Sequence, residues 1–368
     1  MRALRLLLLF LIWAGPAGAE PALESLNLPD GFKVSLFARV SAAREMVVMD
    51  GGRTVFVSTR RNRVYRVDDI DGDGVADKVS VVLIHQTAPH GIALGPEGLF
   101  YVVETHRITR YRLSEAYPRQ LISKQEVYDG LIDNRWHGWR SAEFGPDGKL
   151  YVAVGAPCNI CRVGGLAGTI LRFDTEDWEP EVLARGVRNS VGFDWQPGTD
   201  ILYFTDNGGD DLGDLIPPDE LNRIEKPDQH FGFPYVWGSA GKAYPDFEGE
   251  EPSDTLISPV VEFEAHAAAL GMLFYRGEMF PEEFQGDAFV VQHGSWNRDP
   301  DDPAGYRVMR IRFGEDHDVA GKEVFIDGFL DQNKEAWGRP AQISAMPDGS
   351  LLISDDFAGA IYRITYQQ

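Results

Sequence analysis

The chain of 368 residues contains 57 acidic and 35 basic side chains, which give it a net charge of −22. This excess of negative charge disfavours nucleic acid and anionic membrane surfaces as partners, because both would repel the protein. The length and the hydrophobic fraction of 43% allow two average domains or one large repetitive domain with an ordinary packed core.

The first 19 residues predict a secretory signal peptide. Arg2 and Arg5 precede the apolar run Leu6–Trp13, and Ala17-Gly18-Ala19 forms a small-residue cleavage pattern. The apolar run is too short for a membrane span, and no later stretch approaches the required length. We therefore expect a mature protein that begins at residue 20 and is exported, either to the periplasm or to the medium.

A turn motif rich in Pro, Asp and Gly recurs along the chain, each time ahead of an apolar or aromatic stretch. Its glycines are separated by 46, 50, 50, 88 and 63 residues, and they are Gly52, Gly98, Gly148, Gly198, Gly286 and Gly349. A unit of about 40 to 50 residues with four short strands is typical of a propeller blade. Six turns predict an all-β chain that forms one six-bladed β-propeller over residues 20–368, with a long insertion within about 199–285.

An acidic stretch follows the first predicted blade strands. Asp69, Asp71, Asp73 and Asp77 occupy positions 1, 3, 5 and 9 of a loop with glycine at position 6, a spacing that can surround Ca²⁺ with oxygen ligands. Ser80 stands where an EF-hand would have glutamate. The loop is therefore a possible structural calcium site, or an acidic turn between two strands.

His137 lies between Trp136 and Trp139, just ahead of the third turn motif. Histidine is the side chain most easily poised for proton transfer near neutral pH, which makes His137 a candidate general base. The alternative is a half-buried loop histidine that packs against its aromatic neighbours.

Two cysteines, Cys158 and Cys161, are the only ones in the chain. In an exported protein this spacing favours a short-loop disulfide. A haem attachment site would need histidine after the second cysteine, where Arg162 stands.

Further polar residues recur at comparable positions. Arg188-Asn189 precedes the fourth turn as His137 precedes the third, and equivalent positions of successive blades face the central channel together. Gly208-Gly209 lies in an acidic segment where backbone carbonyls could approach a cation, although a solvated loop is the alternative. Asn297-Arg298 and Arg339 add basic groups ahead of late blade strands, which suggests a cationic pocket in an acidic protein.

From Leu28 to its C-terminus the chain resembles the soluble quinoprotein sugar dehydrogenases, the six-bladed group with glucose and sorbosone dehydrogenases. It is most similar to the sorbosone-dehydrogenase-like branch. The segments that carry the resemblance are Gly155-Ala-Pro-Cys-Asn159, Gly186-Val-Arg-Asn189, Asp206-Asn-Gly208, His293-Gly-Ser-Trp-Asn-Arg298 and Trp337-Gly-Arg-Pro340.

The resemblance implies oxidation of a sugar hydroxyl or an aldehyde by pyrroloquinoline quinone (PQQ) with bound calcium. His137 matches the general base, and Arg188 matches the arginine that polarises the quinone oxygen. The backbone carbonyls of Gly208 and Gly209 match the calcium ligands. The residues that match cofactor contacts are Gln86, Asn189, Asn297, Arg298, Arg339 and Asp356.

The chain also departs from the glucose enzymes of that group. Trp136 stands where those enzymes have aspartate before the base, and Ala341 stands at the position of a second carboxylate-binding arginine. The substrate and the electron acceptor are left open. Two alternatives remain: a calcium-dependent propeller hydrolase such as a lactonase, and a propeller that binds a ligand without catalysis.

Overall fold

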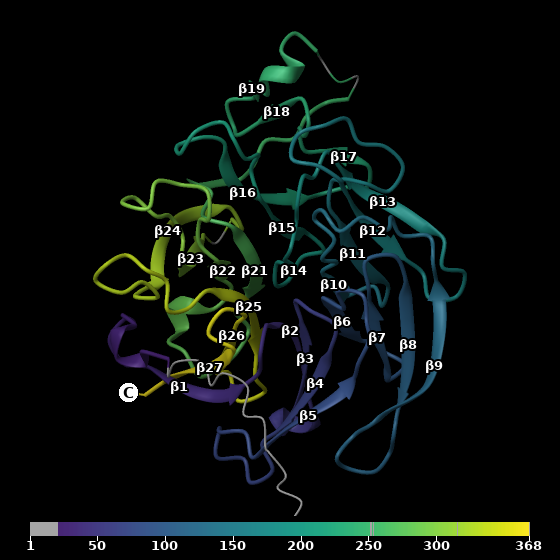
Figure 1. The fold of residues 1–368 in the computed structure, drawn as a ribbon, viewed down its shortest axis with the longest axis vertical. Coiled ribbons are helices and arrows are strands. Elements are labelled where there is room, and N and C mark those ends of the chain that lie inside the picture. Colours follow the sequence, from purple (N-terminus) through teal and green to yellow (C-terminus); the bar gives the residue numbers. More distant parts are fainter. Residues whose placement is uncertain (1–20, 251, 253, 315, 368) are drawn as a thin grey trace, which may run out of the picture.

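The structure is a computed structural model that describes residues 21–250, 252, 254–314 and 316–367. The predicted signal peptide therefore lies outside the described residues. Six sheets of antiparallel strands surround a central axis, as Figure 1 shows, which confirms the predicted six-bladed β-propeller. The six sheets are numbered here as blades in chain order.

The first three blades use consecutive strands from the axis outward. Blade 1 comprises β2 (Ala43–Met49), β3 (Thr54–Thr59), β4 (Val64–Asp68) and β5 (Lys78–Leu83). Blade 2 comprises β6 (Gly91–Leu94), β7 (Leu99–Val103), β8 (Ile108–Leu113) and β9 (Leu121–Tyr128). Blade 3 comprises β10 (Ala142–Phe144), β11 (Leu150–Val154), β12 (Thr169–Phe173) and β13 (Pro180–Arg185).

The last three blades depart from this order at two places. Blade 4 comprises β14 (Phe193–Trp195), β15 (Leu202–Asp206), β16 (Pro218–Ile224) and β20 (Val261–Ala265). Blade 5 comprises β21 (Ala269–Phe274), β22 (Ala288–Gln292), β23 (Arg307–Phe313) and β24 (Val319–Ile326). Blade 6 comprises β25 (Pro340–Ala345), β26 (Leu351–Asp355), β27 (Ala360–Tyr366) and β1 (Phe32–Arg39).

Blade 6 closes the ring by joining the two ends of the chain. The N-terminal strand β1 pairs antiparallel with the C-terminal strand β27, with Phe32 opposite Tyr366 and Arg39 opposite Ala360. Full closure removes the unpaired sheet edges that would otherwise promote aggregation. The repeat did not predict this strand, because the turn motif marks only the two inner strands of each blade.

The recurring turn joins the innermost strand of each blade to the second strand. Gly148, for example, lies between β10 and β11 with φ of 74°, and Gly198 lies between β14 and β15 with φ of 77°. Residues with a side chain rarely adopt this conformation, which explains why glycine recurs there. The connections at the other end of each blade are longer and more polar, and they build the candidate site described below.

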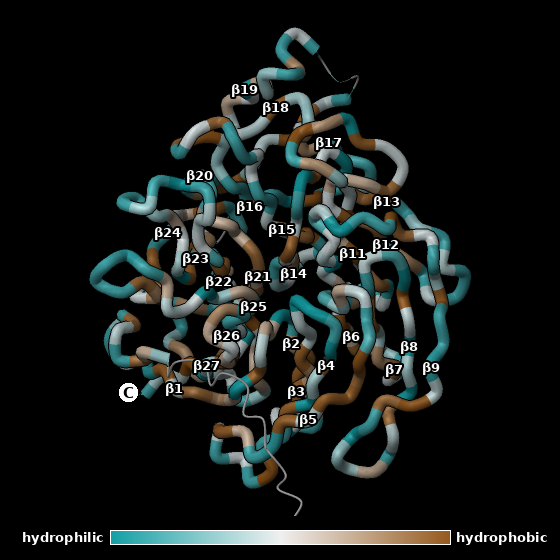
Figure 2. Tube along the Cα trace, in the orientation of Figure 1, coloured by the Kyte–Doolittle hydropathy of each residue, from teal (hydrophilic) through white to brown (hydrophobic). Residues whose placement is uncertain are grey.

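The core lies between neighbouring blades. The second strands are buried on both faces, as in β3 and β15, whereas the outermost strand β9 is largely exposed. Figure 2 shows hydrophobic residues concentrated in the strands and hydrophilic residues in many of the surrounding loops. The packing of each sheet on its neighbours therefore accounts for the long apolar stretches.

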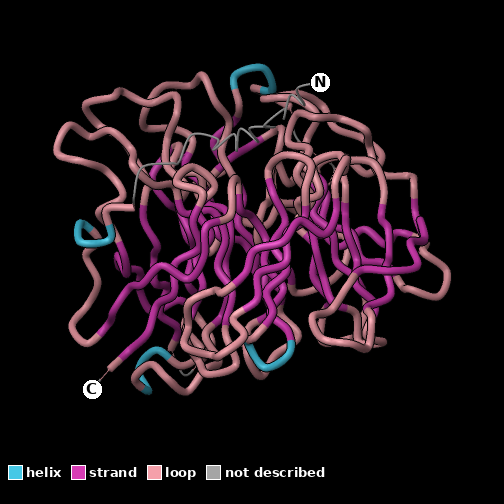
Figure 3. The backbone as a smooth tube through the Cα atoms, turned by 60° about the horizontal axis from the view of Figure 1, so that its bottom comes forward, coloured by secondary structure: helices cyan, strands magenta, loops and turns pink. Residues whose placement is uncertain are grey.

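Helical structure among the described residues is limited to 3₁₀ turns, which Figure 3 shows as short cyan segments. These are η1 (Leu23–Ser25), η2 (Asp50–Gly52), η3 (Pro245–Phe247) and η4 (Glu282–Phe284). None of them has the length or hydropathy needed to cross a membrane.

The excursion of blade 4 runs from residue 225 to 260, between β16 and β20. It contains β17 (Gln229–His230), which pairs parallel with β13, and the small hairpin of β18 (Val236–Trp237) and β19 (Lys242–Ala243). The remainder of the 199–285 interval forms strands of blades 4 and 5. An apolar cluster joins the excursion to the loop between β11 and β12: Ala156, Ile160, Val163, Phe233, Tyr244 and Phe247.

Candidate active site

A cavity of about 450 Å³ opens at the end of the channel opposite the glycine turns. Its walls come mainly from loops that connect neighbouring blades or the two middle strands of one blade. The polar and aromatic lining residues are Arg44, Arg60, Arg135, Trp136, His137, Trp139, Arg188, Asn189, Asn207, Asp210, Asp219, His266, His293, Trp296, Asn297 and Arg339. This composition suits a polar, anionic small molecule with a planar portion.

His137 lies on the loop between β9 and β10 and contributes its imidazole to the cavity. Its Nδ1 lies 2.9 Å from the carbonyl oxygen of Ala156, so Nδ1 carries the proton and Nε2 keeps its lone pair. Gly155 allows this approach, because a Cβ there would lie 2.5 Å from the Cβ of His137. Burial, together with the nearby charge of Arg188, lowers the pKa of His137 to about 3. The imidazole is therefore neutral near pH 7 and can accept a proton at Nε2.

Arg188 is held rigidly below the cavity, with only 3% of its surface exposed. Its guanidinium donates to the Asn159 carbonyl at 2.9 Å, to Asn159 Oδ1 at 2.8 Å, to the Asn207 carbonyl at 3.1 Å and to Asp210 Oδ2 at 3.0 Å. Four of its five N–H donors are fixed in this way, so the guanidinium places an oriented positive charge beside the cavity.

The disulfide between Cys158 and Cys161 is present, as the sequence predicted. It encloses Asn159, the residue that makes two hydrogen bonds with Arg188. Asn159 Oδ1 also accepts the backbone N–H of Asp210 at 2.8 Å. The disulfide loop thus fixes the position of the arginine, a function beyond the general stabilisation that a disulfide provides.

Two buried amide oxygens at the cavity lack partners among the described residues. They are Oδ1 of Asn189 and Oδ1 of Asn297. The amide nitrogens of both side chains are engaged, that of Asn189 with Asn207 Oδ1 at 3.4 Å and that of Asn297 with Asp210 Oδ1 at 2.7 Å. An unpaired buried acceptor costs free energy, so a ligand, a cation or water in the cavity would satisfy these oxygens.

Arg339 reaches the opposite wall of the cavity. Its guanidinium donates to the Ser295 carbonyl at 3.0 Å and to the Tyr306 hydroxyl at 2.8 Å. The guanidinium also lies over the Tyr306 ring, 5.0 Å from its centroid. These contacts hold a positive charge at the wall without neutralising it with a carboxylate.

Asp356 organises a group of cations that the sequence analysis did not identify. Its carboxylate lies 2.8 Å from Arg44, 3.4 Å from Arg60 and 2.8 Å from His293 Nε2. Trp139 lies beside both arginines, with ring-centroid distances of 5.5 Å to Arg44 and 4.9 Å to Arg60. A sequence signal existed only for Arg44, which forms the charged pair Arg44-Glu45 inside the innermost strand β2.

The two glycines proposed as calcium ligands lie on the loop between β15 and β16. Gly208 lines the cavity, and its N–H donates to Asp219 Oδ1 at 2.9 Å. Gly209 is directed toward the excursion, where an added Cβ would lie 2.9 Å from the Tyr244 ring. Asp210 and Asp219 also line the cavity, so anionic side chains surround the point where the cation is expected.

The structure places three predicted cofactor contacts outside the cavity wall: Gln86, Arg298 and Asp356. Arg298 is turned toward Asp302, to which it donates at 2.5 Å, and toward the carbonyl oxygen of Ala265 at 3.4 Å. Gln86 lines an adjoining pocket of about 360 Å³ and donates to the carbonyl oxygen of Ile84 at 2.8 Å. Local hydrogen bonds thus direct the side chains of Arg298 and Gln86 away from the cavity, where the resemblance implied that they would contact the cofactor.

The acidic loop between β4 and β5 lies at the end of blade 1 remote from the cavity. Carboxylate oxygens of Asp69, Asp71 and Asp77 lie within 4.8 Å of one another. Asp73 is not part of this group and accepts the N–H of Val75 at 2.8 Å. The other carboxylates also accept backbone N–H groups, as Asp69 does from Gly72 and Gly74.

Comparisons with solved structures reveal the same fold in sugar dehydrogenases. The PQQ domain of pyranose dehydrogenase from Coprinopsis cinerea aligns with a TM-score of 0.76 and 18% identity over 92% of this chain and 97% of that one. The calcium structure of a Trichoderma reesei carbohydrate-active enzyme of family AA12 aligns with a TM-score of 0.78 and 18% identity, over 93% and 97% of the two chains.

The PQQ-bound aldose sugar dehydrogenase of Streptomyces coelicolor aligns with a TM-score of 0.65 and 20% identity, over 93% of this chain and 100% of that one. These neighbours have the fold that the resemblance implied, and none of them singles out the sorbosone-dehydrogenase-like branch.

Sequence comparisons extend over nearly the whole chain. An uncharacterised protein of Borreliella burgdorferi (strain ATCC 35210 / DSM 4680 / CIP 102532 / B31) is 33% identical over 373 residues, covering 98% of this chain and 96% of that protein. The TrAA12-like family matches residues 26–367. The chain therefore belongs to the TrAA12-like family.

Proposed function

We propose that the protein is an exported PQQ-dependent dehydrogenase that oxidises a sugar or an aldehyde with calcium bound beside the cofactor. The observation that carries this proposal is the set of unsatisfied acceptors, Asn189 Oδ1 and Asn297 Oδ1, in a cavity that is also rich in arginine. PQQ has three carboxylates, and fixed guanidinium groups recognise carboxylates with charge-assisted hydrogen bonds.

The chain offers separate positions for the cofactor and for the cation. Arg339 on one wall, and Arg44 with Arg60 on another, would hold carboxylates of PQQ. The carbonyl oxygens of Gly208 and Gly209 would hold calcium, because Ca²⁺ prefers oxygen ligands. Calcium would also offset the repulsion between the cofactor and the carboxylates of Asp210 and Asp219, which line the same cavity.

When bound, PQQ supplies the acceptor for the hydride that leaves the substrate carbon. His137 Nε2 takes the hydroxyl proton, while the Nδ1–H bond to Ala156 keeps the imidazole in the required tautomer. Arg188 contributes positive charge that is already oriented by Asn159 and Asp210. Because the pKa of His137 is lowered to about 3, the imidazolium that forms releases its proton readily afterwards.

The proposal of export rests on the predicted signal peptide over residues 1–19, and the Cys158–Cys161 disulfide is consistent with an oxidising compartment. The electron acceptor is expected to reach the cavity from the outside, where Trp136 and Trp296 are 53% and 73% exposed.

The experiment that tests this function uses residues 20–368 reconstituted with PQQ and Ca²⁺. Reduction of an electron-acceptor dye is measured over a panel of aldoses and aldehydes, and lactones are tested in parallel without PQQ. We expect dye reduction that requires both PQQ and calcium. Hydrolysis of a lactone without PQQ, or no dye reduction with any substrate, would contradict the proposal.

A further inference from the structure

His293 also lines the cavity, together with His137 and His266. It follows directly after strand β22, and 7% of its surface is exposed. Its Nε2 lies 2.8 Å from Oδ1 of Asp356, whose other oxygen contacts Arg44 at 2.8 Å. Burial opposes ionisation of Asp356, but the charge of Arg44 and the hydrogen bond from His293 hold the pKa of Asp356 well below its usual range. Asp356 is therefore a carboxylate at neutral pH, and its partner nitrogen must carry the hydrogen.

His137 and His293 are thus fixed in opposite tautomers. His137 donates from Nδ1 to a carbonyl oxygen and keeps its lone pair on Nε2. His293 donates from Nε2 to a carboxylate and keeps its lone pair on Nδ1, for which no hydrogen-bond partner exists among the described residues. His137 and His293 are therefore two neutral imidazoles in one cavity, each with one nitrogen anchored and one nitrogen able to accept a proton. His266, the third histidine of the lining, has Nε2 2.8 Å from the carbonyl oxygen of Gly213 and Nδ1 3.9 Å from Oδ1 of Asp210.

The proposed reaction releases two protons in each cycle. Oxidation of one hydroxyl-bearing carbon sends a hydride to the cofactor and a proton to His137. Two one-electron acceptors then remove two electrons from the reduced cofactor, and the former hydride leaves as the second proton. Each cycle consumes one alcohol and two oxidised acceptors. It produces one carbonyl compound, two reduced acceptors and two protons. His137 accounts for only the first of these protons.

We propose that His293, oriented by Asp356, accepts the second proton at Nδ1 when the reduced cofactor is reoxidised. This inference rests on the proposed function. It names the residue that accepts the proton released during reoxidation, which the proposed function does not assign.

The surroundings of the two histidines favour His137 as the acceptor of the substrate proton and His293 as the acceptor of the second proton. An imidazolium on His293 would face the carboxylate of Asp356 at 2.8 Å. The other charged groups near His293 are Arg44 and Arg339, which oppose its protonation and favour release of the proton once the cofactor is oxidised. An imidazolium on His137 has only a carbonyl oxygen as partner, and Arg188 repels it. His293 is therefore the better acceptor for the proton that leaves the cofactor when an external acceptor removes its electrons.

The kinetic test separates the two halves of the cycle in the holoenzyme with PQQ and calcium. Rapid mixing with aldose measures reduction of the bound cofactor, and mixing of the reduced holoenzyme with ferricyanide measures its reoxidation. His293→Gln keeps an N–H that can donate to Asp356, and we expect it to slow reoxidation at least about tenfold more than reduction. We also expect one ionisation to disappear from the pH profile of reoxidation. His137→Gln is the matched variant and should show the reverse pattern.

Equal slowing of both half-reactions by His293→Gln, or an unchanged reoxidation rate and pH profile, would overturn the proposal. A second measurement is independent of PQQ. In protein with ¹⁵N-labelled histidine, NMR should show His293 as the Nε2–H tautomer, with a lower pKa in Asp356→Asn than in the wild type.

Observation of the Nδ1–H tautomer, or an unchanged His293 pKa in Asp356→Asn, would also overturn the proposal. If wild-type protein fails to bind PQQ, the proposed function fails, and the NMR result still reports on the His293–Asp356 pair.

Discussion

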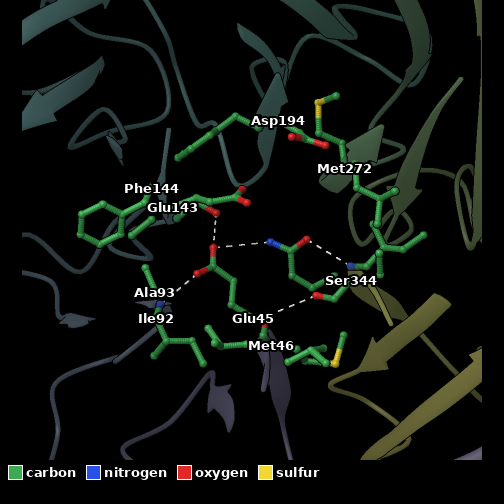
Figure 4. A pocket seen from close by; sticks show the side chains of 18 of the residues that line it. Glu45, Met46, Ile92, Ala93, Glu143, Phe144, Asp194, Met272 and Ser344 are labelled. Atoms are coloured by element: carbon green, nitrogen blue, oxygen red, sulfur yellow. Dashed lines mark hydrogen bonds between the residues drawn. The ribbon is translucent and has the colours of Figure 1, made fainter. Parts of the chain in front are cut away.

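The two ends of the central channel contain charged cavities of similar size, about 450 Å³ at the upper cavity with His137 and about 390 Å³ at the lower pocket with Glu45. Figure 4 shows the lower pocket, where Glu45 reaches across the channel and is enclosed by hydrogen bonds. Its carboxyl accepts from Ser141 Oγ and from the N–H of Ile92, and Gln342 lies at 3.5 Å.

The lower pocket satisfies most of its own polar groups. Asp194 there accepts two hydrogen bonds from Arg276 as well as the backbone N–H groups of Trp195 and Phe274. In the upper cavity, oxygens of Asn189 and Asn297 and one ring nitrogen each of His137 and His293 have no partner among the described residues. The two cavities therefore differ in their unpaired polar atoms rather than in their size, and this difference marks the upper cavity as the candidate active site.

The largest expected effect is a loss of activity in a variant of the upper cavity that a variant of the lower pocket does not show. His137→Ala should lower kcat by about 10²- to 10⁴-fold, because it removes the proton acceptor. Cofactor affinity should stay within about threefold, since His137 is assigned to the substrate proton. Steady-state dye reduction and PQQ titration check both expectations. Glu143→Gln in the lower pocket is the control and should leave kcat unchanged. Equal loss of activity in both variants would remove the distinction between the cavities.

Two arginines, Arg339 and Arg298, should differ in their contribution to the affinity for PQQ. Arg339→Ala should weaken PQQ binding by about ten- to a hundredfold, because it removes charge-assisted hydrogen bonds to a carboxylate. Arg298→Ala should change the affinity by less than about threefold, since Arg298 is engaged with Asp302. Fluorescence titration of correctly folded variants measures both. A stronger effect of Arg298→Ala would restore the role that the resemblance implied for it.

The lower pocket should instead control how stability depends on pH. Burial raises the pKa of Glu45 to about 8, from an ordinary value of 4.5. The folded state therefore keeps a proton that the unfolded state has released, and Glu45 makes stability fall as pH rises from about 4.5 to 8. The contribution is about 1.4 kcal/mol per pH unit inside this window.

Urea denaturation at several pH values compares the wild type with Glu45→Gln, which cannot titrate. The variant should lose this part of the slope, and so gain stability relative to the wild type as pH rises. Parallel stability curves for the two proteins would show that Glu45 is not buried as a protonated acid.

The smallest effect concerns the acidic loop, whose residues line neither cavity. If the loop binds Ca²⁺, calcium at about five times its Kd should add about 1 kcal/mol to the free energy of unfolding. Asp71→Ala should remove this part of the calcium response, measured without PQQ by thermal denaturation. An identical calcium response in the variant would identify the loop as an acidic turn.

The sequence predicted the blades because each requires a glycine with positive φ in the same turn. It did not predict β1 as the closing strand. Pro29-Asp30-Gly31 forms a similar turn ahead of Phe32–Arg39, but this turn does not join two inner strands, and the strand pairs with residues more than 300 positions away. His137 and Arg188 could be placed together because equivalent loops of neighbouring blades converge on the axis.

Arg44 and Arg60 could not be found in this way. Arg44 lies inside an apolar strand and Arg60 in a short connection, and only the folded structure shows that both meet Asp356. The directions of Arg298 and Gln86 were likewise set by local hydrogen bonds that no sequence pattern reveals.

Calorimetric titration of the apoprotein with PQQ tests the central claim most directly, with calcium present in one experiment and chelated in the other. We predict saturable binding of one PQQ per chain that weakens at least about tenfold when calcium is removed. Glu143→Gln in the lower pocket should not alter this binding. The absence of saturable binding, or tighter binding of the anionic cofactor in Glu143→Gln, would contradict the assignment of the upper cavity as the cofactor site.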